Sequence, residues 1–506
     1  MSTHLSVSHM HENEQHGDGQ SQLHHARTRS SPIGWISMAL GAGITGWLIW
    51  HSFQPGGFHS TTPAVTEHAP RLWGIGIIPF IALLAAIAVL PLMRKTQHWW
   101  ESNINRLTVS LVCAGLTILY TVIFVGMSDV VHVLEHAIVA EYIPFIVLLF
   151  SLYVISGGIR VTGDMAARPS TNTAFLAIGA GLASFVGTTG ASMLLIRPLL
   201  QTNQERKYVV HTVVFFIFLV SNIGGSLLPI GDPPLFLGYL KGVPFLWTFV
   251  LTPEWAFATV TLLIVYYVLD RRMYAKEDVS SLQRDAVQKE PLRIAGLHNF
   301  LWLGAVVFAV ALLSPGREYF GFTVFPFLRE IVMLALVGVS LLLTSHEIHR
   351  GNQFNYHAIL EVAALFVGIF IAMQIPVQVL NLHGSELGLT EPWHFFWATG
   401  GLSAFLDNAP TYVVFFETAN AMQPTGGEGI LTLKSGHFIR EDLLIGISLG
   451  AVFLGAMTYI GNGPNFMVKS IAEQAGVRMP SFFGYLFKYA IVILGPLFVV
   501  MTLLFL

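Results

Sequence analysis

The chain has 506 residues, of which 54% are hydrophobic and only 11% are charged, and its mean hydropathy is +0.64. Soluble domains carry about 25% charged residues, so this composition indicates a polytopic helical membrane protein. The net charge of -3 argues against nucleic acid as a partner, and the one cysteine, Cys113, excludes an internal disulfide.

The N-terminal residues 1–32 are polar and rich in histidine, which is typical of a disordered cytoplasmic tail. Metal sensing by these histidines is the alternative, and no other feature of the sequence supports it. The apolar run Ile33–Trp50 follows Arg27 and Arg29, a pattern that cleaved signals and membrane spans share. Because the run is long and has no clear small-residue cleavage site, we expect a retained first span.

Runs of about 20 apolar residues can cross the hydrocarbon core as helices. Such runs predict about 11 spans, near 33–50, 72–93, 107–126, 142–160, 208–239, 254–270, 297–314, 330–345, 358–380, 442–468 and 484–505. Two further apolar stretches, 172–200 and 393–421, are broken by Gly187–Gly190 and by Asp407–Thr411. Each is predicted to form a re-entrant helical hairpin with its polar tip near the middle of the membrane.

The positive-inside rule fixes an orientation for this arrangement. With the N-terminus in the cytoplasm and both broken stretches as hairpins, 20 of the 26 Lys and Arg residues lie on the cytoplasmic side. Treating either stretch as a full span reverses everything after it and weakens this bias. The sequence therefore predicts a multi-pass protein of the cell inner (plasma) membrane with a cytoplasmic N-terminus.

The charged segment 271–296 divides the chain into two halves that resemble each other. Matched positions include Glu141 with Glu361, Phe175 with Phe395, Gly231 with Gly461, and Pro234 with Pro464. Because the first hairpin enters from the cytoplasm and the second from outside, the repeats are predicted to be inverted in the membrane.

The predicted fold is thus an all-α polytopic membrane protein with two inverted repeats. Each repeat holds a re-entrant helical hairpin and a discontinuous transmembrane helix. The expected domains are the tail 1–32, an N-terminal transmembrane repeat 33–270, a cytoplasmic linker 271–296 and a C-terminal inverted repeat 297–506.

Two apolar segments, Leu219–Phe236 and Met457–Phe466, are interrupted by glycine, proline and small polar residues. Unwound backbone is tolerated at bilayer depth only where protein or a water-filled cavity surrounds it. Discontinuous helices of this kind frame the substrate site in many secondary transporters. The candidate ion- or substrate-binding residues at the hairpin tips and broken helices are Thr188, Thr189, Ser221, Asn222, Ser226, Asp232, Asp407, Asn408, Thr411, Thr458, Asn462 and Asn465.

Asp232 and Asp407 are the two carboxylates in this set. A charged side chain at membrane depth costs about 2.5–3.5 kcal/mol on insertion scales, so each should face a cavity and have a partner. Hard cations prefer oxygen ligands, and one buried carboxylate can hold a proton or a sodium ion in turn. We therefore expect sodium at Asp232 and Asp407. The alternative is that either aspartate only caps a half-helix.

Four further polar residues lie near the predicted span ends. Glu141 and Glu361 are expected to be interfacial. His132 and His136 share one face of a segment just before a span, which fits a solvated amphipathic turn better than a metal site.

The run Ser221–Ser226 followed by Pro229–Asp232 resembles the pattern of NhaD-type sodium/proton antiporters, an asparagine, paired glycines and Pro-Ile-Gly-Asp. Asp407–Asn408 with Thr411 is similar to the Asp-Asn-Leu-Thr-Thr hairpin tip of that family. These antiporters belong to the ion transporter superfamily with the citrate transporter-like (CitMHS) proteins, arsenite permeases and divalent-anion/sodium symporters. The resemblance covers roughly residues 72–506 and implies a homodimer in which a transport domain moves against a scaffold by elevator-like alternating access.

The chain departs from these family patterns at three places. Pro233–Pro234 stands where the antiporters have a threonine run, and Ala409–Pro410 where they have an apolar residue and threonine. The first tip, Gly187–Gly190, lacks the Ser-Asn-Thr signature of the dicarboxylate symporters. This last departure favours a cation over a carboxylate as the transported solute.

The sequence therefore predicts a secondary active transporter, a sodium/proton antiporter with its ion site at two hairpin tips and two broken helices. The alternative is a cation-coupled transporter of citrate or another di- or tricarboxylate, although no arginine falls at the predicted midplane. A membrane-embedded enzyme is a third class, but no Ser–His–Asp grouping or HExxH motif is present, so no enzymatic activity is expected. We expect no cofactor, only a transported sodium ion and proton, and as partners the lipid bilayer, a small ion or carboxylate, and a second copy in a homodimer.

Overall fold

The computed structural model describes residues 43, 45–47, 49–50, 69–287, 290–422, 429–434 and 436–506. The chain divides into two compact units, Met1–Ile44 and Thr45–Leu506, and the elements below belong to the second unit. The predicted tail 1–32 lies outside the described residues, as does most of the predicted first span 33–50.

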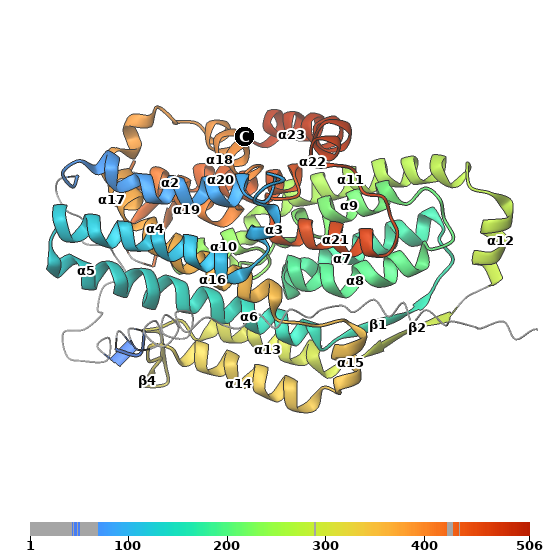
Figure 1. The fold of residues 1–506 in the computed structure, drawn as a ribbon, viewed down its shortest axis with the longest axis horizontal. Coiled ribbons are helices and arrows are strands. Elements are labelled where there is room, and N and C mark those ends of the chain that lie inside the picture. Colours follow the sequence, from blue (N-terminus) through green and yellow to red (C-terminus); the bar gives the residue numbers. More distant parts are fainter. Residues whose placement is uncertain are drawn as a thin grey trace, which may run out of the picture. The chain divides into compact units, whose positions relative to one another are not determined.

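The long helices of the second unit run roughly parallel to one another (Figure 1). Those before the predicted linker are α2 (Trp73–Val89), α3 (Gln97–Trp100), α4 (Asn103–Phe124), α5 (Met127–Leu134), α6 (Ile143–Gly157), α7 (Pro169–Val186), α8 (Thr188–Thr202), α9 (Val210–Leu219), α10 (Pro233–Leu240) and α11 (Thr252–Tyr274). Those that follow are α12 (Val279–Val287), α13 (His298–Leu312), α14 (Leu328–Leu343), α15 (His346–Gly351), α16 (His357–Ala372), α17 (Gln374–His383), α18 (Pro392–Ser403), α19 (Asn408–Asn420), α20 (Glu441–Leu454), α21 (Gly463–Gln474), α22 (Phe482–Tyr485) and α23 (Ile491–Phe505).

Shorter elements complete the fold. The 3-10 turns are η2 (Ile223–Ser226), η3 (Phe245–Leu251), η4 (Gly384–Leu387) and η5 (Gly455–Met457), and the π-helical segments are η1 (Glu135–Tyr142) and η6 (Leu486–Ala490). Three antiparallel ribbons pair β1 (Arg160–Asp164) with β2 (Glu290–Ala295), β3 (Glu318–Tyr319) with β4 (Phe322–Thr323), and β5 (Ile430–Thr432) with β6 (Phe438–Arg440).

Four helical stretches in the described part of the chain are long and apolar enough to cross a membrane. They are Asn103–Phe124, Met127–Gly157, Phe245–Tyr274 and Phe482–Phe505. The pair α16 and α17, bent by 44°, adds a fifth if both helices belong to one span. Helices of this length and composition, with little sheet, fit an all-α membrane protein. The larger number of spans stays a prediction from the sequence.

The stretch Met127–Gly157 begins earlier than the sequence predicted. The sequence analysis predicted a span near 142–160. Instead α5, η1 and α6 form one continuous helix, and Glu141 lies near its middle with only 5% of its surface exposed. The expected interfacial position of Glu141 stays a prediction from the sequence. The turn that carries it is π-helical, a rare geometry that is frequent at functional sites.

Both stretches predicted as hairpins are pairs of packed helices with a break between them. Helices α7 and α8 join at Gly187, whose φ of 78° is a left-handed conformation that a side chain would strain. Helices α18 and α19 are separated by residues 404–407, where Asp407 caps α19 by accepting a hydrogen bond from the Ala409 amide.

Each of these helix pairs is followed by an interrupted helix. Residues 220–232 separate α9 from α10 and contain η2, and residues 455–462 separate α20 from α21 and contain η5. The described structure thus has the same order of elements in both halves, a helix pair and then a broken helix.

The β1–β2 ribbon joins the predicted linker to the first helix pair. Strand β1 leads from α6 into α7, and β2 comes from the charged segment 271–296, which also forms α12 (Figure 1). The segment between the halves is therefore attached, through β1, to the start of the first helix pair.

Asp164 at the end of β1 is buried, and its Oδ1 atom has no hydrogen-bond partner among the described residues. Burial, together with the charges of Glu205, Asp285 and Glu290, raises the pKa of Asp164 to about 6. An aspartate in an unfolded chain has a pKa of about 3.9, so ionised Asp164 destabilises the folded state above pH about 6, and this penalty is gone below pH about 4.

We therefore expect Asp164→Asn to stabilise the protein at pH 7.5, on the order of 1–3 kcal/mol, and to have no effect at pH 4. Thermal melting of the purified protein at both pH values measures this. Asp278→Asn, at an exposed position of the charged segment 271–296, serves as the control. Identical melting of Asp164→Asn and the unmodified protein at pH 7.5 contradicts the assignment.

Candidate ion-binding site

Three side chains meet around the carboxylate of Asp232. Thr188 Oγ1 and Asn462 Nδ2 each donate a hydrogen bond to Oδ1 at 2.9 Å, and Asn408 Nδ2 donates to Oδ2 at 2.7 Å. Thr188 begins α8, Asp232 precedes α10, Asn408 begins α19 and Asn462 precedes α21. Both helix pairs and both broken helices thus contribute one residue each, and we call these four residues the carboxylate centre.

Glycine allows the backbone to come close enough to form this centre. Gly231 and Gly461 directly precede Asp232 and Asn462 in the sequence. Each lies so near the carbonyl oxygen of an earlier glycine, Gly225 or Gly455, that an added Cβ would collide with it. The same close approach therefore occurs beside the centre in both halves, and a larger residue would push the two broken helices open.

The two carboxylates are used differently. Asp232 is only 1% exposed and makes no side-chain hydrogen bond to the start of α10, so it does not act as a cap. Asp407 accepts a hydrogen bond from the Ala409 amide at 3.1 Å, as the capping alternative predicted. Neither carboxylate forms an ion pair with any residue that the structure describes. Asp232 in particular is held by neutral donors alone.

A second group of amides joins the broken helices to each other. Asn222 Nδ2 donates to Asn465 Oδ1 at 2.7 Å, and Asn465 Nδ2 donates to the carbonyls of Gly455 and Thr458, both at 2.9 Å. Ser221 Oγ lies 2.9 Å from Ser192 Oγ on α8. These contacts fix η2 and η5 relative to each other beside the carboxylate centre.

The remaining candidates lie at the same breaks, but three of them bond to backbone oxygens. The hydroxyls of Ser226, Thr411 and Thr458 donate to the carbonyls of Ile223, Asp407 and Ala404, respectively. Thr189 is half-buried in the first turn of α8. In this structure, therefore, these four residues make no side-chain hydrogen bond with Asp232.

Two buried oxygens beside the centre have no donor. The side-chain oxygens of Asn222 and Asn408 are both buried and have no hydrogen-bond partner among the described residues. Unpaired buried acceptors are costly, and a small cation offers such oxygens the positive charge that they lack. Grouped His, Cys, Asp and Glu side chains of the kind that hold transition metals are not found within the described ranges.

Sequence reasoning missed a second charged group. Lys241 Nζ lies 2.6 Å from Glu417 Oε1 and 3.1 Å from Glu141 Oε1, and all three side chains are nearly buried. One feature of the sequence pointed to this charged group, the match of Glu141 with Glu361 between the two halves. Glu361 is also ion-paired, to Arg106 at 2.9 Å. Lys241 itself follows a short apolar segment, and this position in the sequence indicates a loop residue.

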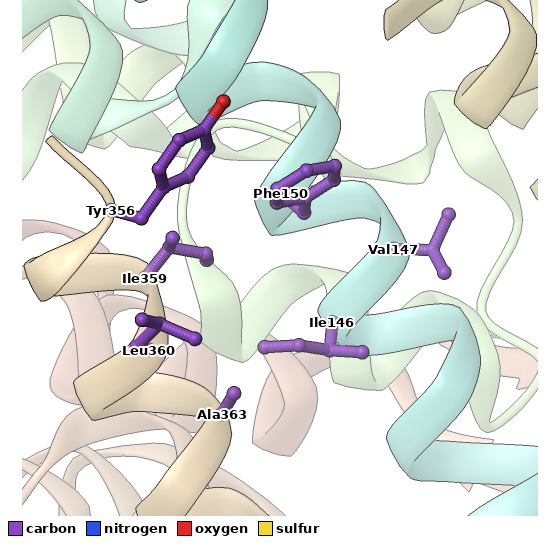
Figure 2. A pocket seen from close by; sticks show the side chains of 7 residues that line it. All are labelled: Ile146, Val147, Phe150, Tyr356, Ile359, Leu360 and Ala363. Atoms are coloured by element: carbon purple, nitrogen blue, oxygen red, sulfur yellow. The ribbon is translucent and has the colours of Figure 1, made fainter. Parts of the chain in front are cut away.

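The cavity in Figure 2 is separate from both groups. It lies between α6 and α16, has a volume of about 390 Å³, and is lined by Ile146, Val147, Phe150, Tyr356, Ile359, Leu360 and Ala363. Only Tyr356 among these carries a polar side-chain atom. The lining of the cavity is therefore suited to an apolar group and not to a charged solute.

A comparison with known families agrees with the resemblance seen in the sequence. No curated protein matches the chain. Residues 69–506, which include every helix from α2 to α23, match the family described as putative citrate transport. The predicted likeness to citrate transporter-like proteins is thus confirmed, and because the match covers most of the chain, the protein belongs to this family of membrane transporters.

Proposed function

We propose that the protein is a secondary active transporter that exchanges sodium for protons, with Asp232 and Asp407 as the groups that hold the cation. One observation supports this most directly. Asp232 is a fully buried carboxylate whose three hydrogen-bond donors are all neutral. A buried carboxylate without a cationic partner is costly, so a sodium ion or a proton supplies the missing charge.

The chemistry of the surrounding groups supports a hard cation. Asn222 and Asn408 present unpaired side-chain oxygens, and the backbone is unwound at η2 and η5. Asp407 directly precedes Asn408, whose Nδ2 donates to Asp232. Two carboxylates of like charge favour a bound cation or proton at one of them, so sodium and protons compete for the same place.

The repeated order of elements supports alternating access. The helix pairs α7–α8 and α18–α19 and the broken helices that follow them correspond in order, and Gly225–Gly231 and Gly455–Gly461 make the same close approach. We propose that the halves are inverted repeats in the membrane and that the four elements around Asp232 move together as a transport domain. A homodimer with a fixed scaffold and an inner-membrane location with the N-terminus inside are part of this proposal.

Cation-coupled transport of citrate or a related carboxylate is the second candidate, and the description of the family favours it. The same sodium site would serve such a transporter. A carboxylate substrate needs N–H groups or cations, but the Thr188 amide at the start of α8 already donates to the Gly231 carbonyl at 2.8 Å. The carboxylate centre offers such a substrate few free donors in this structure.

Everted membrane vesicles distinguish the two candidates. Sodium-evoked proton movement, followed with a pH-sensitive dye, is the expected result for exchange, and sodium-dependent uptake of labelled citrate is the result for the second candidate. Absence of both activities in vesicles that contain the folded protein overturns the proposal.

Asp407→Asn tests the ion site within this assay. Asparagine can still accept the hydrogen bond from the Ala409 amide, because it is also a good N-cap, so the hairpin should keep its structure. We expect the loss of the charge to reduce sodium-evoked proton movement about tenfold or more, since each 1.4 kcal/mol of lost ion binding is tenfold. Asp442→Asn, at a half-exposed ion pair with Arg440, is the control that should remain active. Full activity of Asp407→Asn means that the ion is held elsewhere.

A further inference from the structure

Glu141, Lys241, Glu417 and His136 form a charged cluster that is distinct from the carboxylate centre. Lys241 Nζ contacts Glu417 at 2.6 Å and Glu141 at 3.1 Å, and His136 Nδ1 lies 3.8 Å from the second carboxylate oxygen of Glu141. None of the four side chains is more than 12% exposed. We call these four residues the charge cluster.

The charge cluster is not electrically balanced when His136 is neutral. It then holds two carboxylates and one ammonium group, which leaves an excess negative charge in a buried place, where unpaired charge is costly. Two further side chains donate hydrogen bonds to the cluster, and both are neutral: Gln374 Nε2 donates to Glu141 at 3.1 Å and Asn420 Nδ2 donates to Glu417 at 3.5 Å. One added proton would balance the cluster.

Within the described ranges, the other charged and titratable groups near the cluster do not supply that balance. Tyr412 of α19 lies within electrostatic range of Lys241 and is neutral at ordinary pH. Glu361 of α16 is bound to Arg106 of α4. Glu135 adjoins His136 in the sequence and is itself acidic, so it brings no positive charge to the cluster. His132, one turn earlier, is exposed.

His136 is suited to take this proton. Its Nδ1 atom is buried and has no hydrogen-bond partner among the described residues, although it faces Glu141. Histidine changes charge between about pH 5 and 8, where the other groups of the cluster do not ordinarily titrate. A proton on His136 gives Glu141 a second cation and makes it compete with Lys241 for that carboxylate.

The cluster is joined to the carboxylate centre through two helices. Helix α10 has Asp232 before its first residue and Lys241 after its last, and α19 begins at Asn408 and carries Glu417 near its end. The two helices pack against each other and are joined at the centre by the hydrogen bond from Asn408 to Asp232. Glu141 instead belongs to the long helix Met127–Gly157, so its ion pair with Lys241 ties α10 to a different element.

We propose that the charge cluster is a proton-binding site, with the proton on His136, and that this proton loosens the Glu141–Lys241 ion pair and frees α10 and α19 to move together relative to η1. The Lys241–Glu417 pair joins α10 and α19 and stays intact during that step. This inference rests on the proposed function, because it takes α10 and α19 to be parts of the moving transport domain. A ligand shifts an equilibrium between two conformations only by binding one of them better. The proton binds the loosened conformation better, because it balances the charge of the cluster in that conformation.

Equilibrium exchange of labelled sodium in proteoliposomes tests this proposal. The pH is equal on both sides, and saturating sodium removes proton competition at Asp232 and Asp407. We expect exchange by the unmodified protein to be several-fold faster at pH 6 than at pH 8. His136→Gln should stay slow at both pH values, because the ion pair is never loosened. Glu141→Gln should stay fast at both, because the ion pair is absent.

His132→Gln is the matched control, since it removes an exposed histidine one turn away on the same helix, and it should follow the unmodified protein. If the cluster had only a structural role, His136→Gln and Glu141→Gln would not show opposite exchange rates that are each independent of pH. The proposal is overturned if His136→Gln keeps the pH response of the unmodified protein.

Thermal melting without any transported ion separates this inference from the proposed function. The unmodified protein and His132→Gln should melt at a higher temperature at pH 6 than His136→Gln does, and this difference should vanish at pH 8. If no variant exchanges sodium, the proposed function fails while the melting result still decides whether His136 binds a proton. Equal pH dependence of melting in His136→Gln and the unmodified protein excludes the site.

Discussion

Asp232→Asn should abolish sodium-evoked proton movement while the protein still inserts into the membrane. At an effective dielectric constant of 20, a cation about 4 Å from a carboxylate is attracted by about 4 kcal/mol. Loss of that attraction weakens ion binding about a thousandfold. The local hydrogen bonds change as well, because both oxygens of Asp232 accept bonds, and the amide group of asparagine must face a donor such as Asn408 or Asn462.

A double variant separates the charge from the hydrogen bonds. In Asp232→Asn with Asn408→Asp, the amide at 232 can donate to a carboxylate at 408, so the 2.7 Å contact is kept with its direction reversed. One negative charge then returns to the centre, and we expect part of the activity to return with it. Asp129→Asn, outside the centre, is the control for a lost aspartate. Unchanged exchange by Asp232→Asn, measured in vesicles at equal protein levels, rules out the carboxylate centre as the ion site.

Arg206→Met should be the most destabilising of the single substitutions considered. Arg206 lies between α8 and α9 and forms two hydrogen bonds to Asp270, at 2.6 and 3.1 Å, while its Nε lies 3.6 Å from Glu277. Asp270 is fully buried and also contacts His211 at 2.8 Å. Removing one partner of a buried ion pair leaves an uncompensated charge and costs about 3–5 kcal/mol.

The reason for this cost can be checked with a second substitution. Replacing both partners, as in Arg206→Met with Asp270→Asn, removes the buried charge along with the ion pair, and we expect most of the lost thermal stability to return. Melting temperatures of the two variants in detergent measure this. If the double variant melts as low as Arg206→Met, the loss comes from packing of the arginine stem and not from an unpaired carboxylate.

The sequence by itself located the breaks in the helices. Gly187, Gly231 and Gly461 interrupt apolar runs, and the structure places helix ends beside each of them because glycine tolerates the backbone geometry and the close approach. The similarity of the two halves was visible for the same reason, since the interrupting residues recur in the same order. The family was likewise indicated by short local patterns around Asp232 and Asp407.

The hydrogen-bond partners of these residues depend on the packing of the folded chain. Asp232 and Asn408 are 176 positions apart, and nothing local shows that they share a hydrogen bond. Ser226, Thr411 and Thr458 are at the breaks as predicted, yet their hydroxyls are bonded to nearby carbonyls, because unwound backbone leaves acceptors that a short side chain can reach.

The charge cluster shows most clearly which features the sequence indicates and which depend on tertiary packing. Composition and apolar runs determine that this chain is a helical membrane protein, because the bilayer requires long uncharged helices with internally bonded backbone. Whether an acidic residue in such a helix lies at an interface or is buried against a lysine depends on packing. Glu141 meets Lys241, 100 positions away, only once α10 lies against η1.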